Sequence, residues 1–281
     1  CRSVGGVMDI KLTHHHGLGN VFLVADTRQV VDGVALGDMA IDWVKGAMTW
    51  CDPVSGVGAD GLLLLGGIGP EMTMRLINAD GSDAEMSGNG IRCLVQAGFL
   101  AENAQFSSVN VSTAAGTRVV DLVEKVDDQT VKLSVSMGLV SPLDEPEHWD
   151  RLECHPDRPV RHLSLGNPHS VVGVDDVDAV DLIDLGQRVP HINLEIVAPG
   201  PEPDAITMRV HERGVGITQA CGTGACAAAE AALTWGLVAQ SAESVTVHMP
   251  GGDALVRVNR DTTEAILTGP AVFIGDVMVH L

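Results

Sequence analysis

The chain contains an internal repeat, and this repeat limits the folds open to it more than any other feature. The segment SGNG at 87–90 matches CGTG at 221–224, and MR at 74–75 matches MR at 208–209. Both matches have the same spacing of 134 residues, so the two segments align without a gap between them. The sequence therefore predicts a duplicated domain.

Each half combines apolar strand patterns with one clear helix. MTMRLIN at 72–78 and ITMRVHE at 206–212 are typical of strands, whereas 88–103 and 222–236 follow the glycine loops as helices, with Gly236 as a C-cap. A further helix is expected at 40–50. The sequence predicts an α+β fold of two pseudosymmetric lobes, each a curved, mostly antiparallel sheet around a central helix.

We expect an N-terminal lobe at 8–125, joined by the last strand at 270–281, and a C-terminal lobe at 126–269. Residues 1–7 are interpreted as a non-structural extension.

Composition excludes several classes of partner. Seventeen basic against thirty-seven acidic residues give a net charge of −20, and no basic run offers a surface for nucleic acid. No apolar run approaches the roughly 20 residues of a membrane span, and the start lacks the order of a signal peptide, so we expect a cytoplasmic protein. The adjacent His14, His15 and His16 point alternately on an extended segment. We therefore expect no metal site there, and His14 and His15 at the surface.

The two glycine loops predict anion sites, one of them with a reactive thiol. A turn that leads into a helix N-terminus presents free N–H groups and the positive end of the helix dipole. Such a site binds a carboxylate or phosphate and lowers the pKa of a thiol at the turn. We interpret Cys221 as a reactive thiolate, and Cys93 and Cys226, further inside their helices, as buried structural residues.

Two such loops favour chemistry at one carbon approached from both sides. Inversion of an amino acid's α-carbon needs a base on one face and an acid on the other, while N–H groups hold the carboxylate. Thiols do this without a cofactor, and none of the four lysines lies in either loop to anchor a pyridoxal Schiff base. We expect a small amino-acid substrate and no cofactor.

Seven segments of the chain carry a family resemblance. They are HGLGNVFLV at 16–24, GADGLLLL at 58–65, RLINADGSDAEMSGNGIRC at 75–93, GNPHSVV at 166–172, NLEIV at 193–197, HERGVGITQACGTGACAA at 211–228 and PGG at 250–252. From about Met8 onward the chain resembles the diaminopimelate epimerases, cofactor-independent isomerases of lysine and peptidoglycan biosynthesis. The resemblance implies a homodimer and a two-base mechanism on LL- and meso-2,6-diaminopimelate.

The resemblance also implies roles for individual residues. Cys221 would be one acid/base thiol, and Ser87 occupies the position of the other, with His169 and Glu212 as polar partners beside the reacting carbon. The groups expected to bind substrate are Asn20, Asn78, Gly88, Asn89, Asn167, Asn193, Arg213, Gly222 and Thr223. The asparagines among them are also common turn residues.

Three positions depart from the family pattern: Ser87 replaces a thiol, Ile217 a glutamate and Val21 an aspartate. A hydroxyl is far less acidic than a thiol, and the helix dipole, worth at most about 2 kcal/mol, does not close the gap. Catalysis is therefore expected to be impaired.

Several explanations of Ser87 fit the sequence. It is an engineered change, or a natural variant that tolerates serine, or the mark of another reaction, the dehydration or racemisation of a proline-like amino acid. A binding protein that kept the site and lost turnover fits as well.

Overall fold

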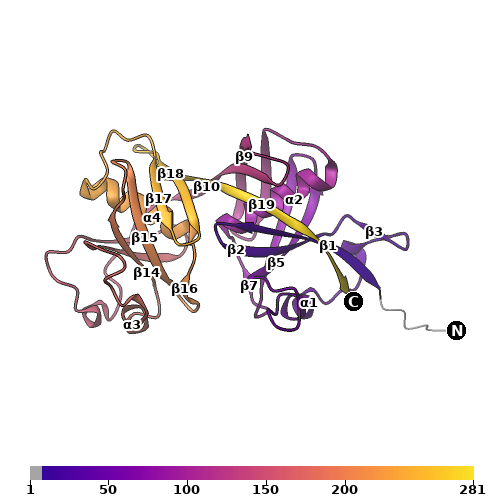
Figure 1. Ribbon diagram of the computed structural model, residues 1–281, viewed down its shortest axis with the longest axis horizontal. Coiled ribbons are helices and arrows are strands. Elements are labelled where there is room, and N and C mark those ends of the chain that lie inside the picture. Colours follow the sequence, from indigo (N-terminus) through magenta and orange to yellow (C-terminus); the bar gives the residue numbers. More distant parts are fainter. Residues whose placement is uncertain (1–7) are drawn as a thin grey trace. The chain divides into compact units, whose positions relative to one another are not determined.

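The computed structural model describes residues 8–281, which form two compact units (Figure 1). Unit 1 contains the residues up to Leu133 and the segment Pro270–Leu281, and unit 2 contains Ser134–Gly269. Both divisions fall within strands, namely β10 (Thr130–Leu139) and β19 (Glu264–His280). The extension predicted at 1–7 lies outside the described residues.

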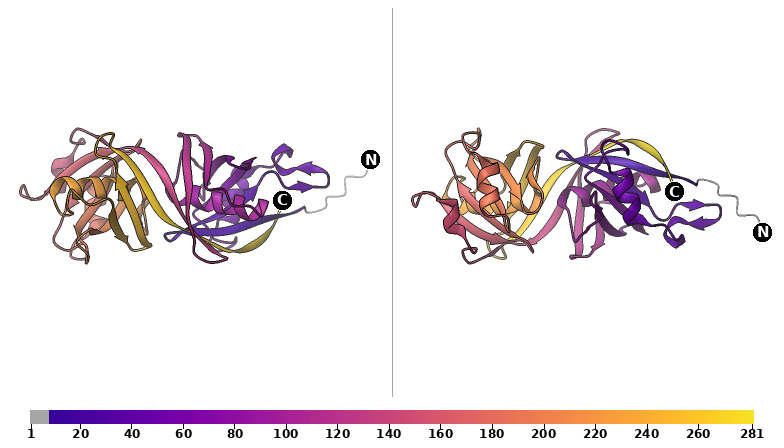
Figure 2. Two further views of the ribbon diagram at one scale, coloured as in Figure 1. Left: turned by 90° about the horizontal axis from the view of Figure 1, so that it is seen from above. Right: turned by 90° about the horizontal axis from the view of Figure 1, so that it is seen from below.

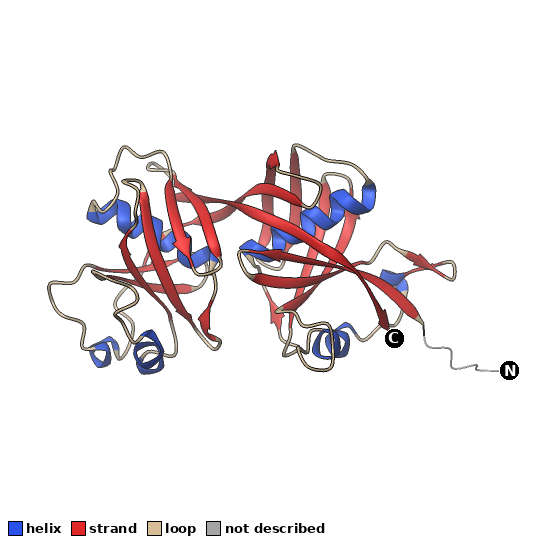
Figure 3. Ribbon diagram, in the orientation of Figure 1, coloured by secondary structure: helices blue, strands red, loops and turns tan. Residues whose placement is uncertain are grey.

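Unit 1 is a strand-rich unit built around one long helix, α2 (Gly88–Glu102) (Figure 3). Its remaining elements are β1 (Asp9–Gly17), β2 (Asn20–Asp26), β3 (Val30–Val31), β4 (Val34–Ala35), η1 (Leu36–Asp38), α1 (Trp43–Trp50), β5 (Gly61–Ile68), β6 (Glu71–Asn78), β7 (Asp83–Ala84), β8 (Ser108–Thr113) and β9 (Gly116–Lys125). The pairs β2–β5 and β6–β8 are parallel, whereas β1–β2, β5–β6, β6–β7 and β8–β9 are antiparallel.

Unit 2 is likewise strand-rich and contains the helix α4 (Gly222–Trp235), which Figure 2 shows among the strands from two further sides. Its remaining elements are β11 (Ser141–Pro142), η2 (Trp149–Leu152), β12 (Val160–Ser164), β13 (Pro168–Gly173), α3 (Leu182–Arg188), β14 (Asn193–Pro199), β15 (Ala205–Glu212), β16 (Gly216–Thr218), β17 (Val245–Met249) and β18 (Gly252–Val258). Here β13–β14 and β15–β17 are parallel, and the other pairs within the unit are antiparallel.

The predicted duplication and α+β fold are confirmed by this correspondence between the units. In each unit, two parallel pairs flank one antiparallel pair, β5–β6 or β14–β15, and the long helix begins after the short strand that follows, β7 or β16. Gly236 adopts the left-handed conformation expected of a C-cap, with φ 74°.

Two details of the helices differ from the sequence prediction. The helix expected at 40–50 begins at Trp43, because the Asp42 carboxylate accepts the Lys45 backbone N–H at 3.0 Å and so caps it. The short helix α3 was not predicted, and its first turn is capped in the same way by Asp181.

The two long helices form the centre of each core. In α2 every residue from Gly88 to Phe99 is buried, and α4 buries its alanines on almost every side. A helix that is apolar all round is stable only when other elements enclose it, and strands surround both of these helices. Cys93 and Cys226 have no exposed surface, as predicted.

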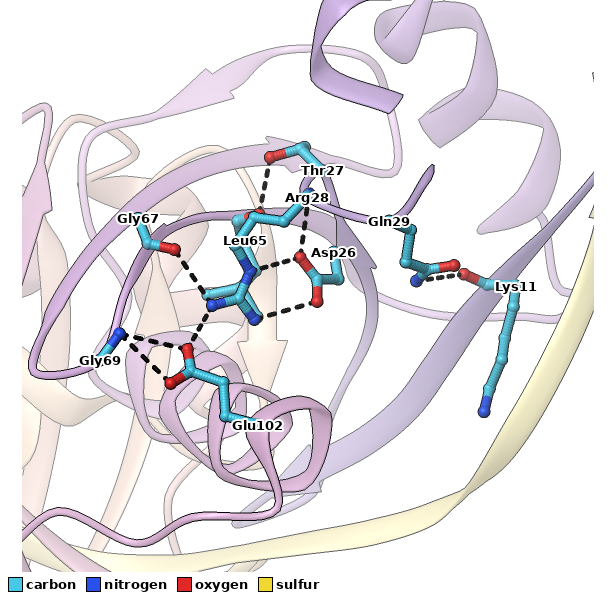
Figure 4. A network of polar contacts seen from close by, with 9 residues as sticks. All are labelled: Lys11, Asp26, Thr27, Arg28, Gln29, Leu65, Gly67, Gly69 and Glu102. Carbon is cyan, nitrogen blue, oxygen red and sulfur yellow. Dashed lines mark hydrogen bonds and ion pairs between the residues drawn. The ribbon is translucent and has the colours of Figure 1, made fainter. Parts of the chain in front are cut away.

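A polar network anchors the C-terminal end of α2 (Figure 4). The Arg28 guanidinium donates to both carboxylate oxygens of Asp26, at 2.7 and 2.9 Å, to the Gly67 carbonyl at 3.0 Å and to Glu102. The Glu102 carboxylate also accepts the Gly69 N–H at 3.2 Å. The end of α2 is thereby tied to β2 and to the β5–β6 turn, which fixes the helix that carries the Ser87 loop.

The histidine triplet corrects one expectation. His15 is not at the surface but fully buried, with Nδ1 2.9 Å from Gln96 Oε1 and Nε2 2.9 Å from Thr13 Oγ1. Burial lowers its pKa to about 4, so the ring is neutral at physiological pH. Within residues 8–281 no cluster of His, Cys, Asp and Glu is arranged to hold a metal. No described helix has the length and apolar character needed to span a bilayer.

Candidate active site

Cys221 occupies the N-cap position of α4. Its backbone is extended, at φ −126° and ψ 114°, and its sulfur accepts the Gly224 N–H at 3.4 Å. The hydroxyl of Thr223 lies 3.5 Å from the same sulfur. Only 6% of Cys221 is exposed. The thiol is therefore held over the first turn of the helix, as the glycine loop predicted.

The pKa of this thiol differs from the sequence expectation. Burial raises the pKa of Cys221 well above its usual range, and the nearby carboxylates of Glu212 and Glu195 raise it further. Hydrogen bonds from Thr223 and from the Gly224 N–H lower the pKa by less. The prediction of a thiolate with a lowered pKa is therefore wrong for the ligand-free protein, because desolvation outweighs the helix N-terminus. Cys221 carries its proton at neutral pH.

A row of polar contacts leads from the buried strands to Cys221. His169 and Glu195 are both 0% exposed, and Nδ1 of the ring lies 2.6 Å from Glu195 Oε1. The other ring nitrogen lies 3.1 Å from Asn167 Oδ1, and the Asn167 amide donates to Thr223 Oγ1 at 3.3 Å. The start of β13 and the residue before it thus bring two predicted residues, His169 and Asn167, beside the Cys221 loop.

Three further predicted residues belong to the same unit. The Glu212 carboxylate accepts a hydrogen bond from the Thr218 hydroxyl. Asn193 is buried, donates to the Pro168 carbonyl at 2.9 Å and accepts the Arg213 backbone N–H at 2.9 Å. These contacts fix the Asn193 amide and the backbone of Arg213, whereas the side chain of Arg213 is exposed.

Ser87 has the corresponding place at the N-cap of α2. Its backbone has φ −138° and ψ 124°, and its hydroxyl oxygen accepts the Gly90 N–H at 3.1 Å. The next side chain, Asn89, is 2% exposed and donates to Asn20 Oδ1 at 2.5 Å. The structure therefore groups Ser87, Asn89 and Asn20, whereas Asn78 donates to the Ser82 hydroxyl at 2.9 Å in the β6–β7 turn.

A fully buried arginine donates hydrogen bonds to the start of α2, next to Ser87. Arg92 donates to the Gly88 carbonyl at 2.9 Å, to Asn89 Oδ1 at 2.7 Å and to the Pro270 carbonyl at 3.2 Å. The guanidinium orients the Asn89 amide, because it occupies the oxygen and leaves the nitrogen to donate to Asn20.

The other two departures from the family pattern lie on different elements. The Val21 N–H donates to Asp60 Oδ2 at 2.8 Å, and the same carboxylate oxygen lies 3.4 Å from the Asn20 amide. Ile217 lies opposite His211 in the β15–β16 pair and is 38% exposed.

Sequence reasoning did not assign Glu195 or Arg92 to the site. In NLEIV a single acidic residue interrupts a strand that is buried on both faces, and a lone carboxylate in such a run is uncommon without a partner. That contrast is the signal that would have found Glu195. Arg92 has the same signal, since it stands one helical turn after the glycines in an otherwise buried helix.

Comparisons with known proteins identify the family of the chain. The family model described as Diaminopimelate epimerase matches residues 12–141 and 162–274. A diaminopimelate epimerase from Halothermothrix orenii is 33% identical over 97% of this chain and 99% of its own length. One from Synechococcus elongatus is 38% identical over 94% of this chain and 96% of its own.

The fold has relatives among solved structures as well. A phenazine biosynthesis protein from Bacillus anthracis superposes with a TM-score of 0.69 at 12% identity, over 98% of this chain and 100% of that one. At that identity the likeness concerns the fold alone. The sequence matches, by contrast, extend over nearly the whole chain, and the chain therefore belongs to the diaminopimelate epimerase family, a family of amino-acid epimerases.

Proposed function

We propose that this protein converts LL-2,6-diaminopimelate to the meso form by proton transfer at the α-carbon, without a cofactor. The observation that carries the proposal is the buried Cys221 thiol at the N-terminus of α4, with the Thr223 hydroxyl 3.5 Å from its sulfur and two carboxylates that raise its pKa. A thiol with a raised pKa donates its proton only to a strong base, and the α-carbanion of an amino acid is one. Its thiolate is in turn strong enough to take such a proton back.

The remaining predicted residues divide into two roles. His169 and Glu212 are the polar partners beside the reacting carbon. The amides of Gly88, Asn89, Gly222 and Thr223, at the positive ends of two helices, hold the carboxylate as charge develops on it. The groups that bind the polar ends of the substrate are Asn20, Asn78, Asn167, Asn193 and Arg213.

Ser87 makes proton transfer unequal at the two faces of the α-carbon. Epimerisation needs a proton-transfer group on each face of the α-carbon, and a hydroxyl is a poor base and a weak acid at neutral pH. We expect exchange through Cys221 to exceed exchange through Ser87, so that inversion is slow. We further propose that the protein acts in the cytoplasm as a homodimer, as the family resemblance implies.

The test is incubation of purified protein with LL- and, separately, meso-diaminopimelate in D₂O, beside a Ser87→Cys variant. NMR follows α-deuteration, and chiral chromatography follows stereochemistry. Turnover that is weak in the parent and at least about 100-fold faster in Ser87→Cys supports the proposal. Absence of exchange and of inversion in both proteins would sink the substrate assignment.

Ser87 also favours a second candidate, an amino-acid-binding relative that has lost turnover. Tight binding of diaminopimelate by calorimetry, without α-exchange in the parent or in Ser87→Cys, would establish that function instead. Exchange or elimination with a proline-like amino acid, offered in the same assay, would point to the other reaction class.

A further inference from the structure

Glu195 is a carboxylate placed where burial is costly. It is 0% exposed, its Oε2 has no hydrogen-bond partner among the described residues, and burial raises its pKa. Its Oε1 lies beneath the first turn of α4, since a Cβ added to Gly224 would meet that oxygen at 2.7 Å. Burying a carboxyl costs free energy that an apolar residue of similar size would not cost. A functional role is therefore expected for this carboxyl.

The contacts of His169 fix the number of protons on this pair. Its Nδ1 faces Glu195 Oε1 at 2.6 Å, and its Nε2 faces the carbonyl oxygen of the Asn167 amide at 3.1 Å. An oxygen that accepts requires a hydrogen on the facing nitrogen, so Nε2 carries one. The second hydrogen lies between Nδ1 and Oε1, whichever atom holds it. The pair is thus electrically neutral and stores one proton more than a neutral ring beside a carboxylate would.

The same contacts give the neighbouring groups a direction. With Nε2–H on its oxygen, Asn167 turns its amide nitrogen to Thr223 Oγ1, 3.3 Å away. The Thr223 hydroxyl then accepts from Asn167, which leaves its own hydrogen for the Cys221 sulfur at 3.5 Å. Four hydrogen-bonded contacts therefore run from Glu195 to Cys221 and end in a donor that stabilises a thiolate.

Unit 1 shows that the fold itself does not require this pair. By strand register, Phe22 stands in β2 where His169 stands in β13, and Leu63 stands in β5 where Glu195 stands in β14. Leu63 also packs on the first turn of its helix, with Cδ2 3.5 Å from the position of a Cβ on Gly90. We call the two residues under each loop a layer. This layer is apolar in unit 1, under the Ser87 loop, and ionisable in unit 2, under the Cys221 loop.

We propose that Glu195 is a positioning residue for the reaction at Cys221: its carboxyl holds the His169 ring and one stored proton beneath the thiol loop. This inference rests on the proposed function. When the Cys221 proton passes to the substrate, the stored proton keeps Nε2–H and the Asn167 amide in place, and the Thr223 hydroxyl stabilises the thiolate left behind. No covalent bond changes other than the S–H bond of Cys221 and the C–H bond of the substrate.

The first measurement is ¹⁵N NMR of the His169 ring in the ligand-free parent and in Glu195→Gln. The titratable groups that face the pair are Glu212 and Cys221, so spectra are recorded from pH 6 to about 9, where Cys221 keeps its proton. We expect the parent to show Nε2–H with a second hydrogen on Nδ1 or on the facing carboxyl oxygen, and Glu195→Gln to show Nε2–H alone. A parent ring whose only hydrogen is on Nδ1 would overturn the proposal, because the pair would then store no additional proton.

The second measurement is α-deuteration of diaminopimelate, in the parent and in Ser87→Cys. We expect Glu195→Gln and Glu195→Leu to slow exchange by about 10- to 100-fold at saturating substrate, with little change in KM. The matched control is Leu63→Met, the same layer in unit 1, which should stay within about twofold because this swap conserves volume. Equal rates for Glu195→Gln and the parent would overturn the role of Glu195.

The two measurements separate this inference from the function on which it rests. Nε2–H in the parent, together with absence of α-exchange in the parent and in Ser87→Cys, would sink the proposed function, and the positioning role of Glu195 with it. A ring protonated on Nδ1 alone, in an active enzyme, would sink the role of Glu195 alone.

Discussion

The two units place different chemistry under the same backbone. Beneath the Ser87 loop the layer is Phe22 and Leu63, and beneath the Cys221 loop it is His169 and Glu195. Asn78 and Glu212 share the 134-residue spacing of the repeat, and here unit 1 has an uncharged polar residue where unit 2 has an ionisable one. The fold therefore accepts either an apolar or an ionisable layer, and the ionisable one occurs where the thiol is.

The charge that unit 1 does bury is of a different kind. The guanidinium of Arg92 is permanently protonated, so it can orient the Ser87 loop and attract an anion but cannot exchange a proton. The buried charge of unit 1 is thus suited to hold an anion, whereas the buried pair of unit 2 is suited to hold a proton. The comparison predicts that equivalent substitutions in the two units have unequal effects.

The largest difference is expected from removing the two N-cap side chains. Cys221→Ala should reduce α-deuteration of diaminopimelate by about 1,000-fold or more, because it removes the group that exchanges the proton, whereas Ser87→Ala should reduce it by less than about 10-fold. Both rates are measured by NMR in D₂O, with circular dichroism as a check on folding. Equal losses would mean that Ser87 is as competent as the thiol, and the asymmetry would not hold.

The layer beneath the helices should respond in stability as well. Leu63→Ala empties a fully buried apolar site and should cost about 2–5 kcal/mol of unfolding free energy. The double variant His169→Phe with Glu195→Leu, which copies both unit 1 residues into unit 2, should cost less than about 1 kcal/mol or stabilise, since it replaces the whole buried pair by apolar residues. Urea unfolding of both variants beside the parent decides this, and a large loss in the double variant would show that the pair is structural.

The pKa of Cys221 offers a test through pH. Because its pKa is raised, alkylation by iodoacetamide should keep rising with pH above 9, and Glu212→Gln should shift the profile to lower pH by removing a carboxylate that raises the pKa. The expected gain in rate at fixed pH is about threefold to tenfold. Peptide mass spectrometry measures the alkylation of Cys221 separately from that of Cys154, whose pH profile should not change. A shift to higher pH would contradict the placement of Glu212.

The smallest difference concerns the caps themselves. The Ser87 oxygen accepts the Gly90 N–H at 3.1 Å, so Ser87→Ala should destabilise the protein by about 1 kcal/mol. Sulfur is a weak acceptor, and its contact with Gly224 N is longer, at 3.4 Å, so Cys221→Ala should cost less through this contact. Thermal melts of the two alanine variants give the comparison, and an equal or larger loss for Cys221→Ala would assign the sulfur a greater part in holding α4.

Sequence reasoning reached the repeat, the α+β class and both long helices, because glycine loops followed by apolar helical patterns are local signals. It did not reach the burial of His15 or Glu195, because partners of these residues are far away in the chain, nor that of Arg92, which donates to the distant Pro270 carbonyl as well as to Gly88 and Asn89. His15 contacts Gln96, and Glu195 contacts His169, at sequence separations of 81 and 26 residues. The position of Cys221 at a helix N-terminus was also not enough to predict its pKa, because the pKa depends on how far the fold excludes water from the thiol.

The last strand has a consequence for the order in which the chain folds. β19 begins beside β18 and then continues along β1, where His280 pairs with Asp9. Unit 2 is one continuous stretch, whereas unit 1 lacks a strand of its sheet until the C-terminal residues have been synthesised. Pairings between such distant residues form slowly, because the intervening loop must close first. The half that leaves the ribosome first is therefore the half that is completed last, and until then β1 presents an unpaired edge that a chaperone or a second nascent chain can bind.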